Sequence, residues 1–212
     1  MHKAIRRMAF LAVALLLGGC NQVYSEKPLF SAGEVGAPRL KNGLWVWSKS
    51  SCVFNEKGPL RDWPKCAEWA LLRAGQVLEF KDEDKTWTAA DYVLAPGNPP
   101  ILQIPDKNDE GTAYFYAALR PLKADALGQV VEFESWPVLC GPPPVGKDDK
   151  ASPSAGADRA NSYVTSQPLP GLEIKDDNCI ARETGPVRAA AKASEAWASE
   201  LQRSHWVRDE AR

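Results

Sequence analysis

Histidine is scarce in this chain, which has only two, His2 and His205, among its 212 residues. General bases are most often histidines, and catalytic zinc sites commonly use two or three, so this scarcity argues against both kinds of site. The sequence also lacks a G-x-S-x-G serine turn, a glycine-rich phosphate loop and a C-x-x-C pair. These absences predict a protein that is not an enzyme and that binds no metal or cofactor.

An excess of positive charge is missing too, because 26 lysines and arginines stand against 27 aspartates and glutamates. Three of the basic residues lie within residues 1–19, a segment that we expect to be removed, which leaves 23 against 27 and a net charge of −4. Binding to nucleic acids requires a concentrated basic face, so no nucleic-acid partner is predicted.

No apolar run is long enough to cross a bilayer, which takes about 20 residues in a helix. The longest run, Met8–Leu17, follows a basic head at residues 2–7 and ends in Leu17-Gly18-Gly19-Cys20. This order of basic head, apolar run and small residues is typical of a cleavable export signal. A buried N-terminal helix that ends by chance in Gly-Gly-Cys is the alternative, but it leaves the basic head without a role.

The residues Leu17 to Cys20 resemble the lipobox of bacterial lipoproteins. The resemblance implies that a diacylglycerol, with fatty acyl chains such as palmitate, is attached to Cys20 after residues 1–19 are removed. Asn21 follows the anchor, in place of the aspartate that resembles an inner-membrane retention signal in enteric bacteria. We therefore expect a lipid-anchored protein of the outer membrane, whose domain lies in the periplasm or at the cell surface.

Without Cys20, four cysteines remain, an even number in the oxidising compartment that the export signal predicts. Four cysteines can pair in three ways. Pairing of sequence neighbours, Cys52 with Cys66 and Cys140 with Cys179, closes each ring over a stretch with the composition of an irregular loop. A metal site is the competing interpretation, but neither the cysteine spacing nor a nearby histidine supports it.

Composition divides the remaining chain into three parts. Residues 20–41 carry scattered glycines and prolines among polar residues, which predicts a flexible tether. A single disulfide-stapled domain is expected over residues 42–206. Within it, residues 141–171 are rich in proline, charge and small polar residues and predict a disordered insert. After Pro186, apolar residues recur at helical spacing, which predicts an amphipathic helix over about 186–203.

Short runs of β-forming residues, separated by turn signals, dominate the domain from residue 43 onward. Such runs at this spacing predict a mainly β fold, either a small antiparallel barrel or a sandwich, with the C-terminal helix packed on it. The expected strands cover residues 43–47, 69–73, 76–81, 86–88, 91–95, 100–104, 113–122 and 129–138.

Eight tryptophans suggest a ligand cage, although in a small β domain most are expected to pack in the core and at its rim. Trp63, in the loop closed by the first disulfide, is the one that we expect to be displayed. Tyr114 and Tyr116, which alternation places on one face of a strand, are further candidates because tyrosines suit a small-ligand pocket. Glu132 and Glu134 also share a face, and we interpret them as a solvated pair rather than as an acid and a base.

Gly43-Leu44-Trp45 resembles the G-x-W that opens the first strand of lipocalins, and the late helix and C-terminal disulfide are similar to that family's plan. The resemblance implies a barrel that carries a small apolar ligand. Asp91-Tyr92 is similar to the family's later T-D-Y motif, but Ala90 stands in place of the threonine. In size and disulfides the chain also resembles small lipid-anchored β domains of bacteria that block lysozymes by inserting a loop.

These observations predict a lipid-anchored cell-envelope protein that binds a small apolar ligand or another envelope component without catalysis. Two alternatives stay open: an inhibitor of an envelope-attacking hydrolase such as lysozyme, and a structural accessory of an envelope complex. A closed barrel with an apolar cavity favours ligand carriage, a filled core with a protruding rigid loop favours inhibition, and a broad exposed apolar patch favours assembly.

Overall fold

The computed structural model describes residues 21–48, 52–81, 86–108, 111–143, 164–198 and 201–209. The protein is mainly β, with 49% in strands and 9% in helices, which confirms the predicted class. In chain order the elements are β1 (Val23–Ser25), β2 (Gly43–Ser48), η2 (Leu60–Asp62), β3 (Ala67–Arg73), β4 (Gln76–Lys81), β5 (Thr86–Asp91), β6 (Val93–Ala95), β7 (Ile101–Asn108), β8 (Gly111–Ala124), β9 (Val130–Pro137), β10 (Leu172–Lys175), β11 (Asn178–Ala181), α2 (Thr184–Ser194) and β12 (Gln202–Arg208).

The strands form one sheet, in which the long strand β8 is the central member. One edge of β8 pairs with β7, and the other edge pairs first with β1, at Tyr24 and Phe115, and then with β9. From β9 the sheet continues through β12, β2, β3 and β4 to β5, and from β1 it continues through β11 to β10. The β1–β11 pair is parallel, whereas the β2–β3, β3–β4 and β8–β9 hairpins are antiparallel.

The sheet curls but does not close, so the closed-barrel form of the prediction is wrong. β5 and β7 approach each other without forming a strand pair among the described residues. The chain between them contains the three-residue β6 and prolines at positions 96, 99 and 100. Proline has no N–H to donate, so this stretch cannot join the two edges through a regular ladder.

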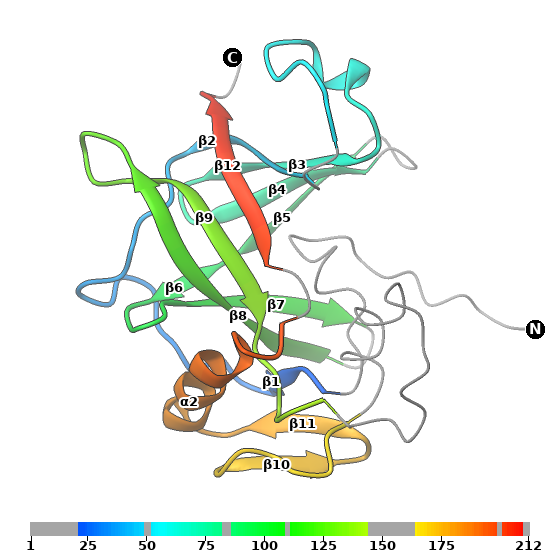
Figure 1. The fold of residues 1–212 in the computed structure, drawn as a ribbon, viewed down its shortest axis with the longest axis vertical. Coiled ribbons are helices and arrows are strands. Elements are labelled where there is room, and N and C mark those ends of the chain that lie inside the picture. Colours follow the sequence, from blue (N-terminus) through cyan, green and yellow to red (C-terminus); the bar gives the residue numbers. More distant parts are fainter. Residues whose placement is uncertain are drawn as a thin grey trace, which may run out of the picture.

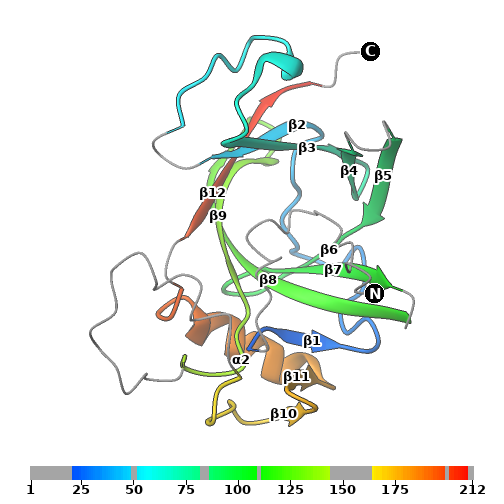
Figure 2. The same cartoon turned by 90° about the vertical axis from the view of Figure 1, so that its right-hand side faces the viewer.

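Two apolar cores lie on opposite faces of β8, because alternate side chains of a strand point to opposite sides. Ala117 and Leu119 enter the first core, enclosed by the two levels of the curled sheet in Figure 2. Tyr116 and Ala118 enter the second core, where α2 covers the sheet (Figure 1). The first core also contains Leu40, Trp45, Trp47, Ala70, Leu72, Val77, Leu94, Leu102, Ile104, Val130 and Phe133.

Helix α2 packs on the sheet as predicted but ends at Ser194, well before residue 203. Val187, Ala190 and Ala191 are buried in the second core, in agreement with the apolar periodicity. The Ser194 hydroxyl donates to the Ala190 carbonyl at 2.7 Å and accepts the Leu139 N–H at 2.8 Å. These two bonds tie the last turn of the helix to the sheet.

Strand β12 begins at Gln202, within the last two residues of the predicted helix, and continues to Arg208. It lies between β9 and β2 and pairs with both, so it joins two parts of the sheet (Figure 1). Ser204 is only 2% exposed and pairs with Phe133 on one side and Trp47 on the other. Because partners on both edges satisfy its backbone, this strand forms from a sequence with few apolar residues.

The prediction of a flexible tether does not hold for residues 21–25, 29–30 and 40, which are buried or half-buried against the domain, whereas most residues from 31 to 39 are exposed. Val23 is fully buried and Phe30 is 3% exposed. The side chain of Gln103 supplies hydrogen bonds to the backbone of this segment. Its Oε1 accepts the N–H groups of Leu29 and Phe30, and its Nε2 donates to the Phe30 carbonyl. A buried side chain of the sheet thus satisfies the backbone of an irregular segment.

Both disulfides join sequence neighbours, which confirms one of the three possible pairings. Cys52–Cys66 closes the loop between β2 and β3, and Cys140–Cys179 links the chain after β9 to β11. Cys140 and Cys179 are both fully buried in the second core. The second bond therefore holds the β10–β11 hairpin against the main body of the sheet.

The predicted insert, residues 141–171, is ordered at both of its ends. Leu169 donates its N–H to the Cys140 carbonyl at 2.8 Å, and Thr165 is 3% exposed. Residues 144–163 lie outside the described residues, as do residues 1–19 and Cys20. The disordered insert within 144–163, the export signal and the acylated cysteine therefore stay predictions.

Candidate functional site

The loop between β2 and β3, residues 52–66, projects from one end of the molecule (Figure 1) and is closed at its base by the first disulfide. We call it the stapled loop. Asn55 Oδ1 accepts the Lys57 N–H at 3.1 Å, and the Asn55 carbonyl accepts the Gly58 N–H at 2.9 Å. The 3-10 turn η2 follows. Covalent closure and these turns together restrict the conformations that the loop can adopt.

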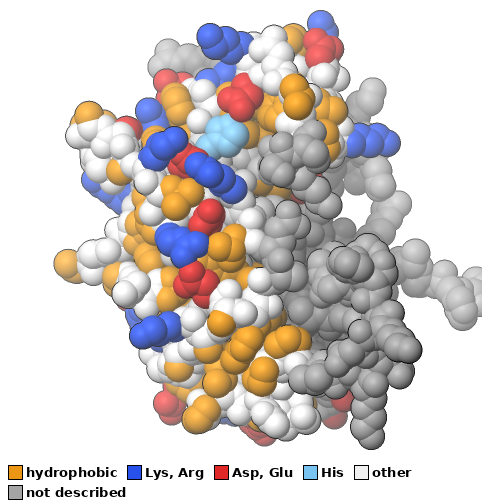
Figure 3. All heavy atoms as spheres, viewed as in Figure 1, with side chains coloured by type: hydrophobic (Ala, Val, Ile, Leu, Met, Phe, Trp, Pro, Cys, Tyr) orange, Lys and Arg blue, Asp and Glu red, His pale blue; other side chains and the backbone are white. Residues whose placement is uncertain are grey.

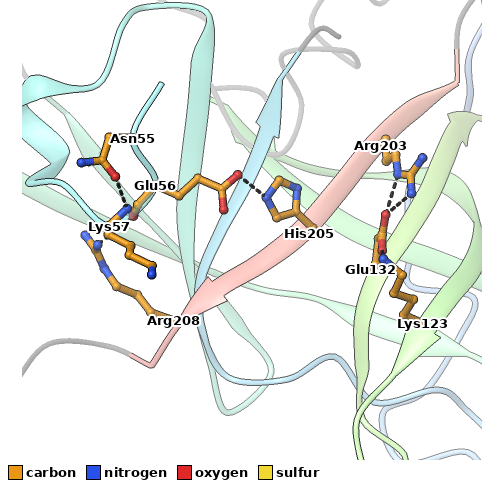
Figure 4. Close-up of polar contacts among 8 residues, drawn as sticks. All are labelled: Asn55, Glu56, Lys57, Lys123, Glu132, Arg203, His205 and Arg208. Atoms are coloured by element: carbon orange, nitrogen blue, oxygen red, sulfur yellow. Dashed lines mark hydrogen bonds and ion pairs between the residues drawn. The ribbon is translucent and has the colours of Figure 1, made fainter. Parts of the chain in front are cut away.

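Strand β12 holds the stapled loop in place through two side chains (Figure 4). His205 Nε2 lies 3.0 Å from Glu56 Oε1. Arg208 Nη1 donates to the Glu56 carbonyl at 2.9 Å and to the Gly58 carbonyl at 3.2 Å. Because β12 pairs with β2 and β9, these contacts connect the loop to the interior of the sheet.

Trp63, the predicted contact residue, is half-buried and supports the loop from within. Its ring centroid lies 4.8 Å from that of Phe54 and 5.9 Å from the Arg208 guanidinium carbon. Its Nε1 is buried and has no hydrogen-bond partner among the described residues. The loop instead displays Val53, which is 90% exposed, and Arg61, whose side chain is 85% exposed.

Glu132 of β9 is the pairing partner of His205 in β12, and it binds cations from the two strands that flank β9 (Figure 4). Lys123 Nζ lies 2.6 Å from Glu132 Oε2, and Arg203 Nε donates to Glu132 Oε1 at 2.6 Å. Glu132 is 7% exposed, and Glu134 binds Arg120 Nη2 at 2.6 Å. The interpretation of a solvated pair is therefore wrong, because cations on adjacent strands cover and neutralise both carboxylates.

An open hollow of about 720 Å³ lies on this face, where Figure 3 shows basic and acidic side chains in alternation beside the histidine. Lys41 forms an ion pair with Asp125 at 3.4 Å and lies 4.0 Å from the centroid of the Trp206 ring. Lys41 is paired with Asp125, whereas Lys123 and Arg203 share the Glu132 carboxylate, so these pairs leave an excess of only one positive charge to attract an anion. The lining residues are Lys41, Lys123, Asp125, Val131, Glu132, Arg203, His205 and Trp206.

The ion pairs of Glu132 make part of the stability pH-dependent. Hydrogen bonds from Lys123, and then from Arg203, hold the pKa of the Glu132 carboxyl below its usual value, although desolvation acts in the opposite direction. A carboxyl whose folded pKa is lowered stabilises the fold above its unfolded pKa of 4.5, and this contribution is lost as the pH falls through the folded pKa.

We therefore expect Glu132→Gln to destabilise the protein by about 1–2 kcal/mol at neutral pH. Urea unfolding at a series of acid to neutral pH values measures the effect, and the difference from the unmodified protein should narrow as the pH falls. Glu173→Gln is the matched control, because the Glu173–Arg182 pair is exposed and should contribute little. A difference for Glu132→Gln that does not change with pH would contradict this account.

Tyr114 and Tyr116 face the second core. Tyr116 is fully buried, its hydroxyl lies 2.5 Å from Ser25 Oγ, and its ring meets the Phe30 ring edge-on at 5.9 Å between centroids. Tyr114 is half-buried at the edge of the same core. The two tyrosines do share a face, but a ligand could reach Tyr116 only if this core opened.

The interior of the curled sheet is closely packed around Trp45. A remaining space of about 10 Å³ is close to the smallest volume that holds one water molecule. Trp45 packs on Phe133 at 5.3 Å between ring centroids and donates its Nε1–H to the Lys41 carbonyl at 2.8 Å. Gly43 has a φ of +127°, and a Cβ there would lie 2.4 Å from the Arg208 carbonyl oxygen. In the G-x-W segment of this chain, Gly43 thus leaves room for the end of β12, and Trp45 fills the first core.

The sequence located the stapled loop through its cysteines but did not show what holds it. Glu56 and His205 are 149 residues apart, and Glu132 and Arg203 are 71 residues apart. Both pairs depend on the register of β12 against β9 and β2. The sequence signal for these contacts is the alternation that would place Arg203 and His205 on one face of a strand. The prediction of a helix as far as residue 203 excluded that interpretation.

The fold and the site define a mainly β domain with one open sheet, a packed helix and a disulfide-closed loop held by the C-terminal strand. No known family, curated protein or solved structure matches this chain. Within the described part of the chain, no helix combines the length and the apolar character needed to cross a membrane. In the same part, no three side chains of histidine, cysteine, aspartate or glutamate come together as a metal site.

Proposed function

We propose that this chain is a lipid-anchored cell-envelope protein that acts without catalysis, by binding another component of the envelope. The signal pattern of residues 1–19 and the lipobox-like cysteine Cys20 support export and a lipid anchor. Asn21 in the next position supports the outer membrane. The two disulfides support an oxidising compartment, so the domain lies in the periplasm or at the cell surface.

The observation that carries the binding proposal is the rigid, displayed stapled loop. A loop that is already fixed loses little conformational entropy when a partner binds it, so more of its contact energy contributes to affinity. Val53 offers the partner an apolar contact, and Arg61 offers a cationic one. The closely packed interior of the sheet favours this surface over carriage of a small apolar ligand inside the fold.

The excess of cations on the loop supports a second candidate function, inhibition of an envelope-attacking hydrolase such as lysozyme. Lys57, Arg61 and Lys65 are exposed on the loop. Two carboxylates oppose them: Glu56, which is bound to His205, and the exposed Asp62, which lies 3.8 Å from Arg61. Glycoside hydrolases hold a pair of carboxylates at the scissile bond. A rigid cationic loop that enters such a cleft would pair with these carboxylates and block it.

An exposed aromatic cluster on β3 to β5 supports the other alternative, a structural role in an envelope complex. Trp87 is 49% exposed and Phe80 is 37% exposed, with 5.4 Å between their ring centroids. Trp69 packs against Trp87 at 6.0 Å. Contiguous apolar surface of this kind is typical of a protein interface.

Photo-crosslinking in cells that express the full-length protein separates the loop from the aromatic cluster. A photoreactive amino acid replaces Arg61 in the loop, Trp87 in the cluster, or Leu127, which is 75% exposed in the turn after β8 and is the control. We expect a light-dependent adduct with another envelope protein at position 61 and none at position 127. Adducts at position 87 alone would reject the loop in favour of assembly.

Inhibition is tested with purified protein, lysozyme and peptidoglycan. If the loop enters the cleft, Arg61→Ala should abolish inhibition, and Arg182→Ala, which removes an exposed arginine outside the loop, should leave it unchanged. Equal inhibition by both variants would show that the loop charge is not involved.

A further inference from the structure

The described chain begins at Asn21, which is fully buried. Its Nδ2 donates to the Gly141 carbonyl at 3.2 Å, and its Oδ1 accepts the Thr165 N–H at 3.0 Å. Its backbone carbonyl accepts the Cys140 N–H at 2.7 Å. Side chain and backbone of Asn21 are thus both bound to the domain.

Strand β1 continues this attachment. Val23 donates its N–H to the Val138 carbonyl at 2.8 Å and pairs in parallel with Cys179. Cys179 is bonded to Cys140, so the first strand lies beside the buried disulfide. For β1 to separate from the domain, the second core would have to open.

This attachment leaves no length for a tether. Consecutive Cα atoms are about 3.8 Å apart, so the Cα of Cys20 can lie no farther than this from the Cα of the buried Asn21. We propose that the domain lies directly on the bilayer in a fixed orientation, with the end formed by β1, β10 and β11 facing the lipid headgroups. The inference rests on the lipid that the proposed function assigns to Cys20.

In this orientation the stapled loop points away from the bilayer. Figures 1 and 2 both place β10 and β11, with β1 beside them, toward one end of the long axis and the stapled loop at the other. A partner of the loop therefore approaches from the aqueous side. The rigid attachment keeps the loop at a constant height above the membrane, which a flexible tether would not do.

The exposed charges of β10 and β11, three carboxylates and two cations, exclude this surface from hydrocarbon and place it at the level of the hydrated headgroups. Glu173 and Lys175 of β10 are exposed, as are Asp176 and Asp177 of the following turn and Arg182 after β11. Charges of both signs are costly within the hydrocarbon layer. The domain thus rests on the membrane surface, and the acyl chains alone enter the bilayer.

Fluorescence quenching on vesicles tests the orientation. The lipidated protein is extracted from membranes and added to phosphatidylethanolamine and phosphatidylglycerol vesicles that carry nitroxide on their headgroups. A fluorophore is placed at Lys175 or, as the matched control, at Arg61, both of which are exposed. Relative to vesicles without nitroxide, we expect a marked loss of fluorescence at Lys175 and no loss at Arg61.

A linker provides an independent measurement. About 20 glycine and serine residues inserted between Cys20 and Asn21 have an r.m.s. reach of about 25 Å. This insertion should restore the fluorescence at Lys175. The same insertion at Leu127, in an exposed turn, should leave the quenching unchanged.

Intact-mass analysis of the same samples distinguishes failure of the anchor from failure of the orientation. An unmodified Cys20 overturns both the proposed anchor and this inference. A diacylglycerol on Cys20, with equal quenching at Lys175 and Arg61, overturns the orientation and leaves the anchor standing. Quenching at Lys175 that persists with the linker overturns the claim that the short attachment fixes the domain.

Discussion

Replacement of both Cys140 and Cys179 by serine is expected to lower the free energy of unfolding by about 4 kcal/mol, which is the loop-entropy value for a ring of this size. The bond spans 39 positions in the sequence, and both residues are fully buried. Two serine hydroxyls in this apolar core add a further cost, because they lose water without gaining assured partners. Denaturant unfolding under oxidising conditions, followed by tryptophan fluorescence, measures the loss.

The Cys52→Ser, Cys66→Ser double variant is the matched control. Its ring spans 14 positions, and the expected entropic loss is about 3 kcal/mol. The two variants should differ most at the Val23 amide, because Val23 pairs with Cys179. Hydrogen exchange at Val23 should become fast only when the buried disulfide is absent. Equal protection of Val23 in both variants would show that this disulfide does not hold β1.

The strands in the middle of the chain could be predicted because their evidence is local. Residues 43–47 were expected as a strand and form most of β2, and residues 76–81 coincide with β4. In both, β-forming residues stand between turn signals. Closure of the sheet is not a local property, since it depends on whether β5 and β7 can pair across a stretch rich in proline.

The errors at the two ends of the chain have a common physical cause. Residues 21–41 have the composition of a tether, and residues 202–203 fell at the end of a helical pattern. Both segments are ordered by partners that are distant in sequence, Gln103 for the first and strands β2 and β9 for β12. Local composition reports what a segment prefers alone, and tertiary hydrogen bonds override that preference.

The same limit applies to the candidate site. The cysteines located the stapled loop, but they did not show that Arg208 lies over Trp63 or that Arg61 is exposed. Asn21 shows a related ambiguity. Its identity suggests a sorting signal in the sequence, yet in the fold both of its side-chain polar atoms are bonded to the domain. One residue can therefore satisfy the fold and carry an address, and the sequence alone does not separate the two.

Alkaline unfolding is the second large effect expected of this fold. Burial raises the pKa of Tyr116 from 10.0 to about 12 and has the same effect on Tyr92. Below the pKa of the unfolded chain, a tyrosine with a raised folded pKa contributes its full stabilisation. As the pH rises through the folded pKa this contribution is lost, because the unfolded chain releases a proton that the folded chain retains. Each tyrosine contributes roughly 2–3 kcal/mol to this loss between pH 10.0 and about 12.

Tyr116→Phe should therefore change the sign of its effect with pH. At neutral pH the variant loses the hydroxyl that lies beside Ser25 Oγ, which costs about 1 kcal/mol, so it should be less stable than the unmodified protein. Well above pH 10.0 it has no buried phenol to ionise at this site, so it should become the more stable of the two. Urea unfolding across this range measures the crossing, with Tyr92→Phe for comparison, and tyrosinate absorbance reports ionisation. If the Tyr116 phenol ionises near pH 10.0 while the fold is intact, or if the two stability curves never cross, burial does not raise the pKa of this side chain.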